Sequence, residues 1–273
     1  MAQVQYAFGG IDVRSLVIIP TYNERENLPS LVQEILEVDL ELDILVVDDH
    51  SPDGTGVLAE ALAAQTGRLL VIHRPGKLGL GTAYLDGFRY ALAHDYERVV
   101  QMDADFSHCP QDLRRLLDAS AGADVVVGSR NVPGGQVENW SRLRHLVSQG
   151  GSLYTRLLLG LPVHDCTGGF KCFRRQALAA LDLDNVRSNG FGFQVEVNYL
   201  CHRHGLRMVE VPITFPDRTA GRSKMSTGIF FEALALVWRL RRGTANETRS
   251  ARSDRYELTR PGAATSAFGD HER

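Results

Sequence analysis

The sequence feature that most constrains the fold is a regular alternation of short apolar runs with segments of helical periodicity. The apolar runs are rich in valine, isoleucine and leucine, and they occupy residues 15–20, 43–49, 69–73, 98–105 and 124–129. Almost continuous apolar runs of this length are typical of strands that are covered on both faces. The alternation therefore predicts an α/β fold with a mostly parallel central sheet and helices on both faces.

The segments between the runs show the periodicity of amphipathic helices. We expect the first helix to begin near Asn27 as its N-cap, because apolar residues then recur on one helical face at positions 28, 31, 32, 35 and 36. The pattern continues in residues 55–65, 81–94 and 111–119. In a sheet of this kind, ligands bind beyond the carboxyl ends of the strands.

Composition indicates a globular protein with one large core. With 273 residues, of which 44% are hydrophobic and 23% charged, the chain is long enough for one domain or at most two. We expect an N-terminal extension at 1–13, a single domain at 14–243 and a disordered tail at 244–273. The tail mixes both charge signs and has no periodic apolar face.

Charge and cysteine usage exclude several classes of protein. A formal net charge of −3 gives no electrostatic basis for binding nucleic acid. The four cysteines contain no CxxC pair, which indicates reduced thiols in a cytoplasmic protein. The first residues lack the charged and apolar regions of a signal peptide, and no apolar run approaches the roughly 20 residues of a membrane span.

Polar, glycine-containing or charged segments follow all five predicted strands. They comprise residues 20–26, 48–54, 73–81, 103–108 and 129–135. One such segment alone could be an ordinary turn. Because the carboxyl ends of parallel strands meet at one edge of a sheet, the five together predict a ligand-binding rim.

Two carboxylates, Asp103 and Asp105, end the fourth run with only Ala104 between them. In a strand both side chains would point to the same side, where two like charges repel each other. A divalent cation removes this repulsion, and carboxylate oxygens suit Mg²⁺ or Mn²⁺ shared with a diphosphate. The pair therefore predicts a metal site; the alternative is two solvated carboxylates at the start of a loop.

Two other motifs do not support a site of their own. The segment 79–84 is a partial GxGxxG, but Tyr84 replaces the third glycine and the segment follows the third run, where a dinucleotide-binding motif would follow the first. The run CHRH at 201–204 has poor spacing for a tetrahedral zinc site and is interpreted as a solvated helix end.

Eight segments together resemble one known family. They are VIIPTYNERENL, ILVVDDHSPDGT, KLGLGTAY, QMDADFSH, VVGSRNVPGG, DCTGGFKCFRR, GFGFQVEV and VPITFPDRTAGRSK, spread over about residues 14–230. They look like the A-type glycosyltransferases of the large inverting family that includes dolichyl-phosphate mannose synthases, in a form without fused transmembrane helices. The resemblance implies the Rossmann-like A-type fold and makes 14–243 a catalytic domain.

The resemblance also implies roles for individual residues. It implies contacts to the nucleoside for Pro20, Tyr22, Glu24, Val47 and Asp49. It implies contacts to the metal and the donor diphosphate for Asp103 and Asp105, and a contact to the nucleotide sugar for Ala104 between them. It implies contacts to phosphate groups for Arg130, Arg218 and Lys224. The catalytic residues would be Asp105, Arg130, Arg218 and Lys224.

Two positions depart from the family pattern. Ser107 stands where some relatives carry glutamine as a further metal ligand, so a direct third ligand is not assigned. Gln149 stands where many relatives have a basic residue, which makes Arg144 the better candidate for a contact to the acceptor phosphate.

The activity that the resemblance implies is transfer of mannose from GDP-mannose to a polyprenyl (dolichyl-type) monophosphate, with inversion and with Mg²⁺ or Mn²⁺ as cofactor. A lipid phosphate is already anionic, so basic residues that neutralise charge should matter more than a strong general base. Two alternative functions are transfer of glucose from UDP-glucose to the same kind of lipid and a non-catalytic sugar-nucleotide-binding subunit.

The sequence leaves several assignments open. Asp165 either caps the next element or lines the acceptor site. Gln194 and Glu196 either line the site or pack a helix. The loop with Arg218 and Lys224 is either a solvated surface loop or a lid that closes over phosphates.

An apolar segment after that loop is expected to form a helix at about 227–242. It is too short to span a bilayer, and Trp238 stands among Arg239, Arg241 and Arg242 near its end. This arrangement favours a helix at a membrane surface, which would place the protein peripherally at the cytoplasmic face. The alternative is a helix packed on the core, with the lipid delivered by a separate membrane subunit.

Overall fold

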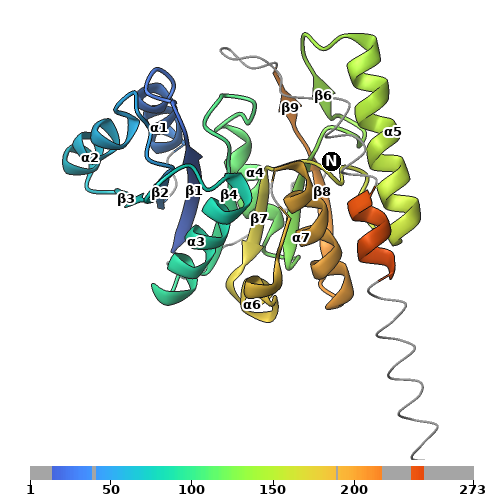
Figure 1. The fold of residues 1–273 in the computed structure, drawn as a ribbon. Coiled ribbons are helices and arrows are strands. Elements are labelled where there is room, and N and C mark those ends of the chain that lie inside the picture. Colours follow the sequence, from blue (N-terminus) through green and yellow to red (C-terminus); the bar gives the residue numbers. More distant parts are fainter. Residues whose placement is uncertain (1–13, 39–40, 189, 217–234, 243–273) are drawn as a thin grey trace, which may run out of the picture.

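The structure is a computed structural model that describes residues 14–38, 41–188, 190–216 and 235–242. Its central element is a seven-stranded sheet with the order β3-β2-β1-β4-β7-β5-β8 (Figure 1). The strands are β1 (Ser15–Thr21), β2 (Leu42–Asp48), β3 (Leu69–His73), β4 (Arg98–Gln101), β5 (Val125–Ser129), β7 (Lys171–Arg174) and β8 (Met208–Pro212). β7 runs antiparallel to its neighbours β4 and β5, whereas the other adjacent pairs are parallel.

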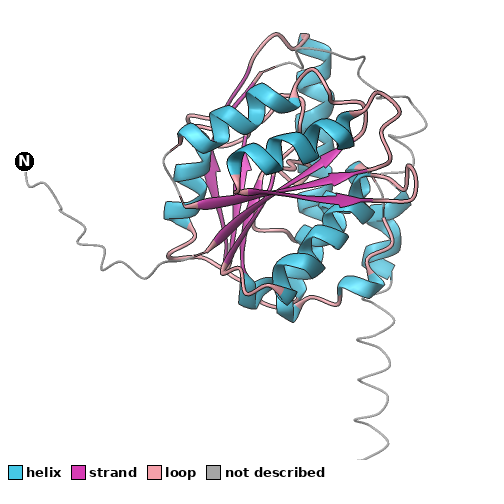
Figure 2. Ribbon diagram, turned by 90° about the vertical axis from the view of Figure 1, so that its left-hand side faces the viewer, coloured by secondary structure: helices cyan, strands magenta, loops and turns pink. Residues whose placement is uncertain are grey.

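Helices cover both faces of this sheet, as Figure 2 shows. They are α1 (Leu28–Glu37), α2 (Thr55–Thr66), α3 (Leu80–Ala93), α4 (Asp112–Ala119), α5 (Arg142–Leu159), α6 (Arg175–Ala180) and α7 (Phe191–Arg203). A short 3-10 helix, η1 (Leu183–Asn185), and a helical segment at 235–242 complete the described helices. A small second sheet pairs β6 (Gln136–Val137) with β9 (Thr214–Phe215).

The side chains of β1 alternate between two apolar cores, one on each face of the sheet. Leu16 and Ile18 pack in the core that contains α3 and α7, whereas Val17 and Ile19 pack in the core that contains α1 and α4. The strand is buried over its whole length, which explains why its sequence is almost continuously apolar. The prediction of a mostly parallel sheet with helices on both faces is confirmed.

One expectation about an individual element is wrong. The fourth strand ends at Gln101, before the two carboxylates that the sequence pattern assigns to it. α1 begins at Leu28 with Asn27 at the N-cap position, as expected, but Asn27 has helical backbone angles and its side chain makes no capping hydrogen bond. Its amide donates a hydrogen bond to Glu24 at 2.8 Å instead. The pattern also contains no signal for β7, because its sequence KCFR has a charged residue at each end and forms no apolar run.

The described residues include no helix that is long and apolar enough to cross a membrane. All four cysteines have free thiols, and those of Cys166, Cys172 and Cys201 are buried. The expected N-terminal extension at 1–13 and the tail at 244–273 lie outside the described residues.

Candidate functional site

The loops of the candidate site meet at one edge of the sheet. Because β1, β2 and β4 are parallel neighbours, the loops that follow them lie at the same edge. β7 runs in the opposite direction, so the loop that precedes it, residues 165–170, reaches this edge as well. The hydrogen bonds described below join the loop after β2 to the β3–α3 loop and the residue after β5 to the loop before β7, as expected for a ligand-binding rim at the carboxyl ends of parallel strands.

The residues with an expected nucleoside role lie at the ends of β1 and β2. Pro20 and Val47 are partners in the register of these strands, and both are buried. Tyr22 is half-buried, and the ammonium of Lys77 lies 3.7 Å from the centroid of its ring. An aromatic ring and a positive charge therefore stand together at this end of the rim.

Asp49 is held by the loop between β3 and α3. Its Oδ1 accepts a hydrogen bond from Nη1 of Arg74 at 2.5 Å, and its Oδ2 accepts one from the backbone N–H of Gly79 at 2.9 Å. Arg74 is buried and also pairs with Asp86 at 3.1 Å. Asp49 therefore organises this loop beside the nucleoside residues. Sequence reasoning missed Arg74, whose only signal is its place in the rim segment 73–81.

The two carboxylates after β4 lie in a loop and have separate partners. The hydroxyl of Tyr84 donates to Oδ1 of Asp103 at 2.7 Å. The backbone N–H of Ser107 and its hydroxyl both donate to Oδ1 of Asp105, at 3.1 and 2.5 Å. Burial raises the pKa of Tyr84 well above its ordinary value, and both carboxylates add to the shift. Both negative charges therefore lie near one phenol, although the strand has ended before them.

His108 supports the backbone of this loop. It is buried, its Nδ1 accepts a hydrogen bond from the N–H of Asp103 at 3.0 Å, and its ring stacks on Phe170 with centroids 4.9 Å apart. Burial lowers the pKa of His108, although the charges of Asp103 and Asp105 act in the opposite direction. The imidazole is therefore neutral at pH 7, and it positions Asp103 without adding positive charge.

The donor set suits a hard divalent cation that a substrate also binds. Carboxylate oxygens are ligands that Mg²⁺ and Mn²⁺ prefer. Within the described part of the chain, no group of three or more histidine, cysteine, aspartate or glutamate side chains could hold a metal ion. Because the Ser107 hydroxyl is engaged with Asp105, Asp103 and Asp105 fit a cation whose remaining ligands come from a diphosphate and water.

Arg130 forms a buried ion pair with Asp165. Its Nε and Nη2 donate to the two carboxylate oxygens at 2.7 Å each, and the exposed fractions of the side chains are 9% for Arg130 and 0% for Asp165. Burial alone would raise the pKa of Asp165, but the Arg130 guanidinium and its hydrogen bonds hold it below the ordinary value. Asp165 also accepts from the N–H of Gly168 at 3.0 Å, so it shapes the loop before β7 and neutralises Arg130.

Trp140, which sequence reasoning missed, connects the two described arginines that are expected to bind phosphate. The guanidinium carbon of Arg144 lies 4.1 Å from the centroid of the Trp140 ring, and that of Arg130 lies 5.6 Å from it. Arg144 belongs to the first turn of α5, whose N-cap is Ser141. Two cationic groups therefore gather around one indole at the start of α5.

The two α7 residues that the sequence leaves undecided have different surroundings. Glu196 accepts hydrogen bonds from the backbone N–H groups of Ser188 at 2.8 Å and Arg187 at 3.2 Å, so it holds the segment before α7. Gln194 accepts from Nζ of Lys171 at 2.6 Å. Lys171 is fully buried, and this burial lowers its pKa to about 8. Its ammonium form therefore still predominates at pH 7.

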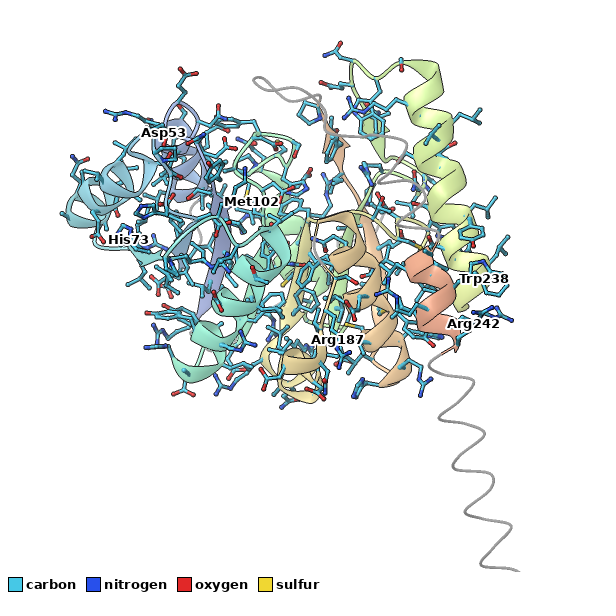
Figure 3. The ribbon with its side chains drawn as sticks, viewed as in Figure 1. Asp53, His73, Met102, Arg187, Trp238 and Arg242 are labelled. Atoms are coloured by element: carbon cyan, nitrogen blue, oxygen red, sulfur yellow. The ribbon has the colours of Figure 1, made fainter. Side chains whose placement is uncertain are left out.

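Arg218, Lys224 and the first part of the helix expected at about 227–242 lie outside the described residues. In the described part, 235–242, Leu236 and Val237 are buried, and Val237 joins the core around α3 and α7. Trp238 is 49% exposed, and the guanidinium of Arg242 lies 5.8 Å from the centroid of its ring (Figure 3). This segment therefore packs one side on the core and exposes a tryptophan with an arginine on the other.

Comparison with known proteins identifies close relatives. Residues 16–182 match the family model described as glycosyl transferase family 2. The undecaprenyl-phosphate mannosyltransferase of Micrococcus luteus is 50% identical over 227 residues, which cover 83% of this chain and 93% of the relative. The polyprenol monophosphomannose synthase of Mycolicibacterium smegmatis is 50% identical over 232 residues, which cover 84% of this chain and 88% of the relative.

Solved structures are similar at much lower sequence identity. The glucosyl-3-phosphoglycerate synthase of Mycobacterium tuberculosis, in complex with Mn²⁺, UDP and phosphoglyceric acid, has a TM-score of 0.61 at 19% identity, over 84% of this chain and 79% of that one. A mannosyltransferase from Pyrobaculum calidifontis, in complex with GDP-Man and Mn²⁺, has a TM-score of 0.55 at 19% identity, over 85% of this chain and 64% of that one. At this identity the similarity concerns the fold.

Proposed function

The chain belongs to glycosyl transferase family 2, and on that basis we propose that it transfers mannose from GDP-mannose to a polyprenyl monophosphate, with inversion at the anomeric carbon. The observation that carries the proposal is 50% identity, over 84% of this chain, to a polyprenol monophosphomannose synthase. The names of both relatives support mannose as the sugar and a polyprenyl phosphate as the acceptor. GDP as the nucleotide is supported by the GDP-Man complex of a mannosyltransferase with the same fold.

We assign the binding of a divalent metal to Asp103 and Asp105, together with the diphosphate of the donor. A cation bound there would offset the negative charge that develops on the diphosphate when its bond to the sugar breaks. Two proteins of the same fold bind Mn²⁺, which supports a divalent metal and leaves Mg²⁺ equally suitable.

The loops after β1, β2 and β3 are assigned to the nucleoside. The Tyr22 ring offers a stacking surface, and Lys77 beside it offers a positive charge to the donor phosphates. Asp49 holds the β3–α3 loop that carries Lys77, so we regard it as the residue that keeps this part of the site in shape.

On the acceptor side, an oxygen of the lipid phosphate forms a bond to the anomeric carbon while the bond from that carbon to GDP breaks. GDP leaves with the bonding electrons. Because the attacking oxygen is already anionic, the reaction requires alignment and charge neutralisation more than a general base. Arg144 beside Trp140 supports this role, and Arg130, Arg218 and Lys224 stay predicted phosphate contacts.

We also propose that the protein reaches its lipid by binding peripherally to a membrane surface. α5 exposes three leucines whose spacing puts them on one helical face, namely Leu146, Leu153 and Leu157. The guanidinium of Arg241 donates to the carbonyl of Leu158, so the segment 235–242 with its exposed Trp238 lies beside α5 (Figure 1). Exposed leucines, an indole and arginines together suit an anionic lipid interface.

The test is a transfer assay with the full-length protein, a short polyprenyl phosphate, Mg²⁺ or Mn²⁺, and either GDP-mannose or UDP-glucose. We expect mannosyl transfer from GDP-mannose, its loss in EDTA and its recovery when either cation is restored. Asp105→Ala should lower kcat by several orders of magnitude and Ser107→Ala much less, because a carboxylate supplies charge as well as a ligand atom.

Each alternative has its own outcome in this assay. Transfer of glucose alone would identify UDP-glucose as the donor. Binding of the sugar nucleotide without any transfer would identify a non-catalytic subunit. Full activity in the presence of a strong chelator would exclude the assigned metal.

A further inference from the structure

Gln194 is a buried amide of which only one end is hydrogen-bonded within the described part of the chain. Its side chain lies on α7, and the residue is 3% exposed. The oxygen Oε1 accepts a hydrogen bond from Nζ of Lys171 at 2.6 Å. The nitrogen Nε2 is buried and has no hydrogen-bond partner among the described residues. A buried donor without an acceptor is unfavourable, so this nitrogen needs a partner that the described protein does not supply.

The contact with Lys171 determines which way the amide points. An ammonium group can donate hydrogen bonds but cannot accept them, so the oxygen of Gln194 must face it and Nε2 must face away. Lys171 also donates to the backbone carbonyl of Gln194 at 3.3 Å, and it is fully buried on β7. Both groups are therefore held on rigid elements, and the donor end of the amide has a defined direction.

The donor end of the amide lies near Asp103, on the other side of Gly169. Gly169 has no side chain, and the position that a Cβ atom would take there lies 3.3 Å from Nε2 of Gln194. The same position lies 3.4 Å from Cε1 of His108 and 3.6 Å from Oδ2 of Asp103. The donor nitrogen of Gln194 and the carboxylate assigned to the donor diphosphate therefore lie on either side of one position beside Gly169, where no side chain stands between them.

The chemistry of the amide limits what it can bind at this position. An N–H group cannot ligate a metal cation, so a substrate that meets it does so through an acceptor atom such as an oxygen. The groups next to a diphosphate in a sugar nucleotide are its phosphate oxygens and the hydroxyls of the sugar. An uncharged amide can donate to either group. Because cationic side chains of this site are already assigned to the phosphates, the sugar hydroxyls are the groups left for Gln194.

We propose that Gln194 is a specificity-determining residue whose Nε2 donates a hydrogen bond to a hydroxyl of the donor sugar, and that Lys171 is the positioning residue that orients it. The assignment rests on the proposed function, because that function puts the donor diphosphate at Asp103. A substrate lacking the hydroxyl would leave the buried N–H unpaired, and sites of this kind reject such analogues strongly.

The experiment compares two variants that lack the donor. Gln194→Glu retains an acceptor for Lys171, whereas Gln194→Met removes it. Comparing the two variants therefore separates the effect on substrate binding from the effect on protein stability. Titration calorimetry with Mn²⁺ and without lipid measures the affinities for GDP, for GDP-mannose and for each monodeoxy analogue of GDP-mannose. Asn198→Leu is the matched control, since it removes another buried amide one turn further along α7. The amide nitrogen of Asn198 donates a hydrogen bond to the carbonyl of Cys166.

We expect Gln194→Met to bind GDP as wild type does, and we expect both variants to lose about tenfold in affinity for GDP-mannose relative to GDP. Gln194→Glu adds a negative charge beside Asp103, which lowers its affinity for GDP itself, so the ratio of the two affinities is the readout for this variant. Wild type should also discriminate against one deoxy analogue, and both variants should lose that discrimination, which isolates the pairwise interaction. The control Asn198→Leu should melt at a lower temperature and keep the wild-type ratio of the two affinities.

Three results would overturn the proposal. In the first, the variants bind GDP-mannose with wild-type affinity. In the second, GDP and GDP-mannose lose affinity equally, which would move the contact from the sugar to the phosphates. In the third, wild type does not bind GDP-mannose at all, which would overturn the proposed function and this assignment with it.

Discussion

Arg130 and Asp165 form an ion pair that is almost completely removed from water. Asp165→Asn keeps the shape of the side chain but leaves the guanidinium without its buried counter-charge. We therefore expect the free energy of unfolding at pH 7 to fall by about 3–5 kcal/mol. Urea denaturation followed by circular dichroism measures this difference, and equal stability of the two proteins would contradict it.

The pH dependence of the same pair gives a control. The pKa of Asp165 is held below its ordinary value of 3.8 in the folded protein. The stabilisation is therefore present above that value and is lost as the pH falls through the folded pKa. The difference between wild type and Asp165→Asn should stay constant from about pH 7 to about pH 5 and should shrink below about pH 4.

At the scale of residues, the sequence predicts site members that stand in a recognisable motif and misses those that only the fold brings there. Asp103 and Asp105 are visible because two carboxylates end an apolar run. Tyr84 and Lys171 lie in largely apolar surroundings, and their roles depend on partners far away in the sequence, such as Asp103 at 2.7 Å from the Tyr84 hydroxyl. A local pattern contains no information about such partners.

At the scale of elements, the sequence pattern predicts the helices and strands between residues 15 and 129, which carry the loops assigned to the nucleotide. α2, for example, begins at Thr55 as expected and ends one residue beyond the predicted 65. β4 ends early because the register pairs Gln101 with Lys171, the first residue of β7, and no strand neighbours it on that side further along. β7 itself depends on pairing with distant strands, which no local pattern reveals.

The exposed leucines of α5 lead to a prediction about membrane binding. Replacing Leu153 and Leu157 together by serine should weaken sedimentation with vesicles that contain phosphatidylglycerol by at least about tenfold. The melting temperature of this double variant should equal that of wild type, since the side chains of Leu153 and Leu157 are mostly exposed, at 53% and 72%. Binding of wild type should decrease as salt is added, because the arginines near Trp238 contribute electrostatic attraction.

Val57→Ser is the matched control, because Val57 is 76% exposed on α2 and should not affect vesicle binding. If the double leucine variant sediments like wild type, α5 does not contact the membrane. If wild type fails to bind vesicles at any salt concentration, delivery of the lipid by a separate membrane subunit becomes the better explanation.

At the scale of the whole molecule, three buried thiols make the fold sensitive to alkali. Burial raises the pKa of Cys166, Cys172 and Cys201 from 9.0 to about 12. Because these folded values lie above the unfolded one, the stabilisation is complete below the unfolded pKa and is lost as the pH rises towards the folded pKa. The pKa of Lys171 is lowered from 10.5 to about 8, so this residue adds stability as the pH rises between these two values. It is a single group, whereas three thiols act in the other direction.

We therefore expect the free energy of unfolding, measured in urea under reducing conditions, to decline above about pH 9. Cys172→Val should decline less steeply, since valine suits an interior strand and has no proton to lose. The two proteins should run parallel between about pH 7 and about pH 8, where the thiols are protonated in both states. An equally steep alkaline decline in the variant would exclude the thiol as its cause.

The place of β7 in the sheet also sets an order of events for a chain that emerges from a ribosome. β2, β3 and β4 can pair as soon as they have been made, because each has a neighbour among the earlier strands. β5 cannot, because its neighbours in the described sheet are β7 and β8, both of which are synthesised later. Until Lys171 has been added, the nascent polypeptide carries one open edge on β4 and two on β5, and open edges of apolar strands invite aggregation. α5 is translated within this interval. A molecular chaperone that protects the nascent chain from aggregation is therefore needed most while those residues are being made.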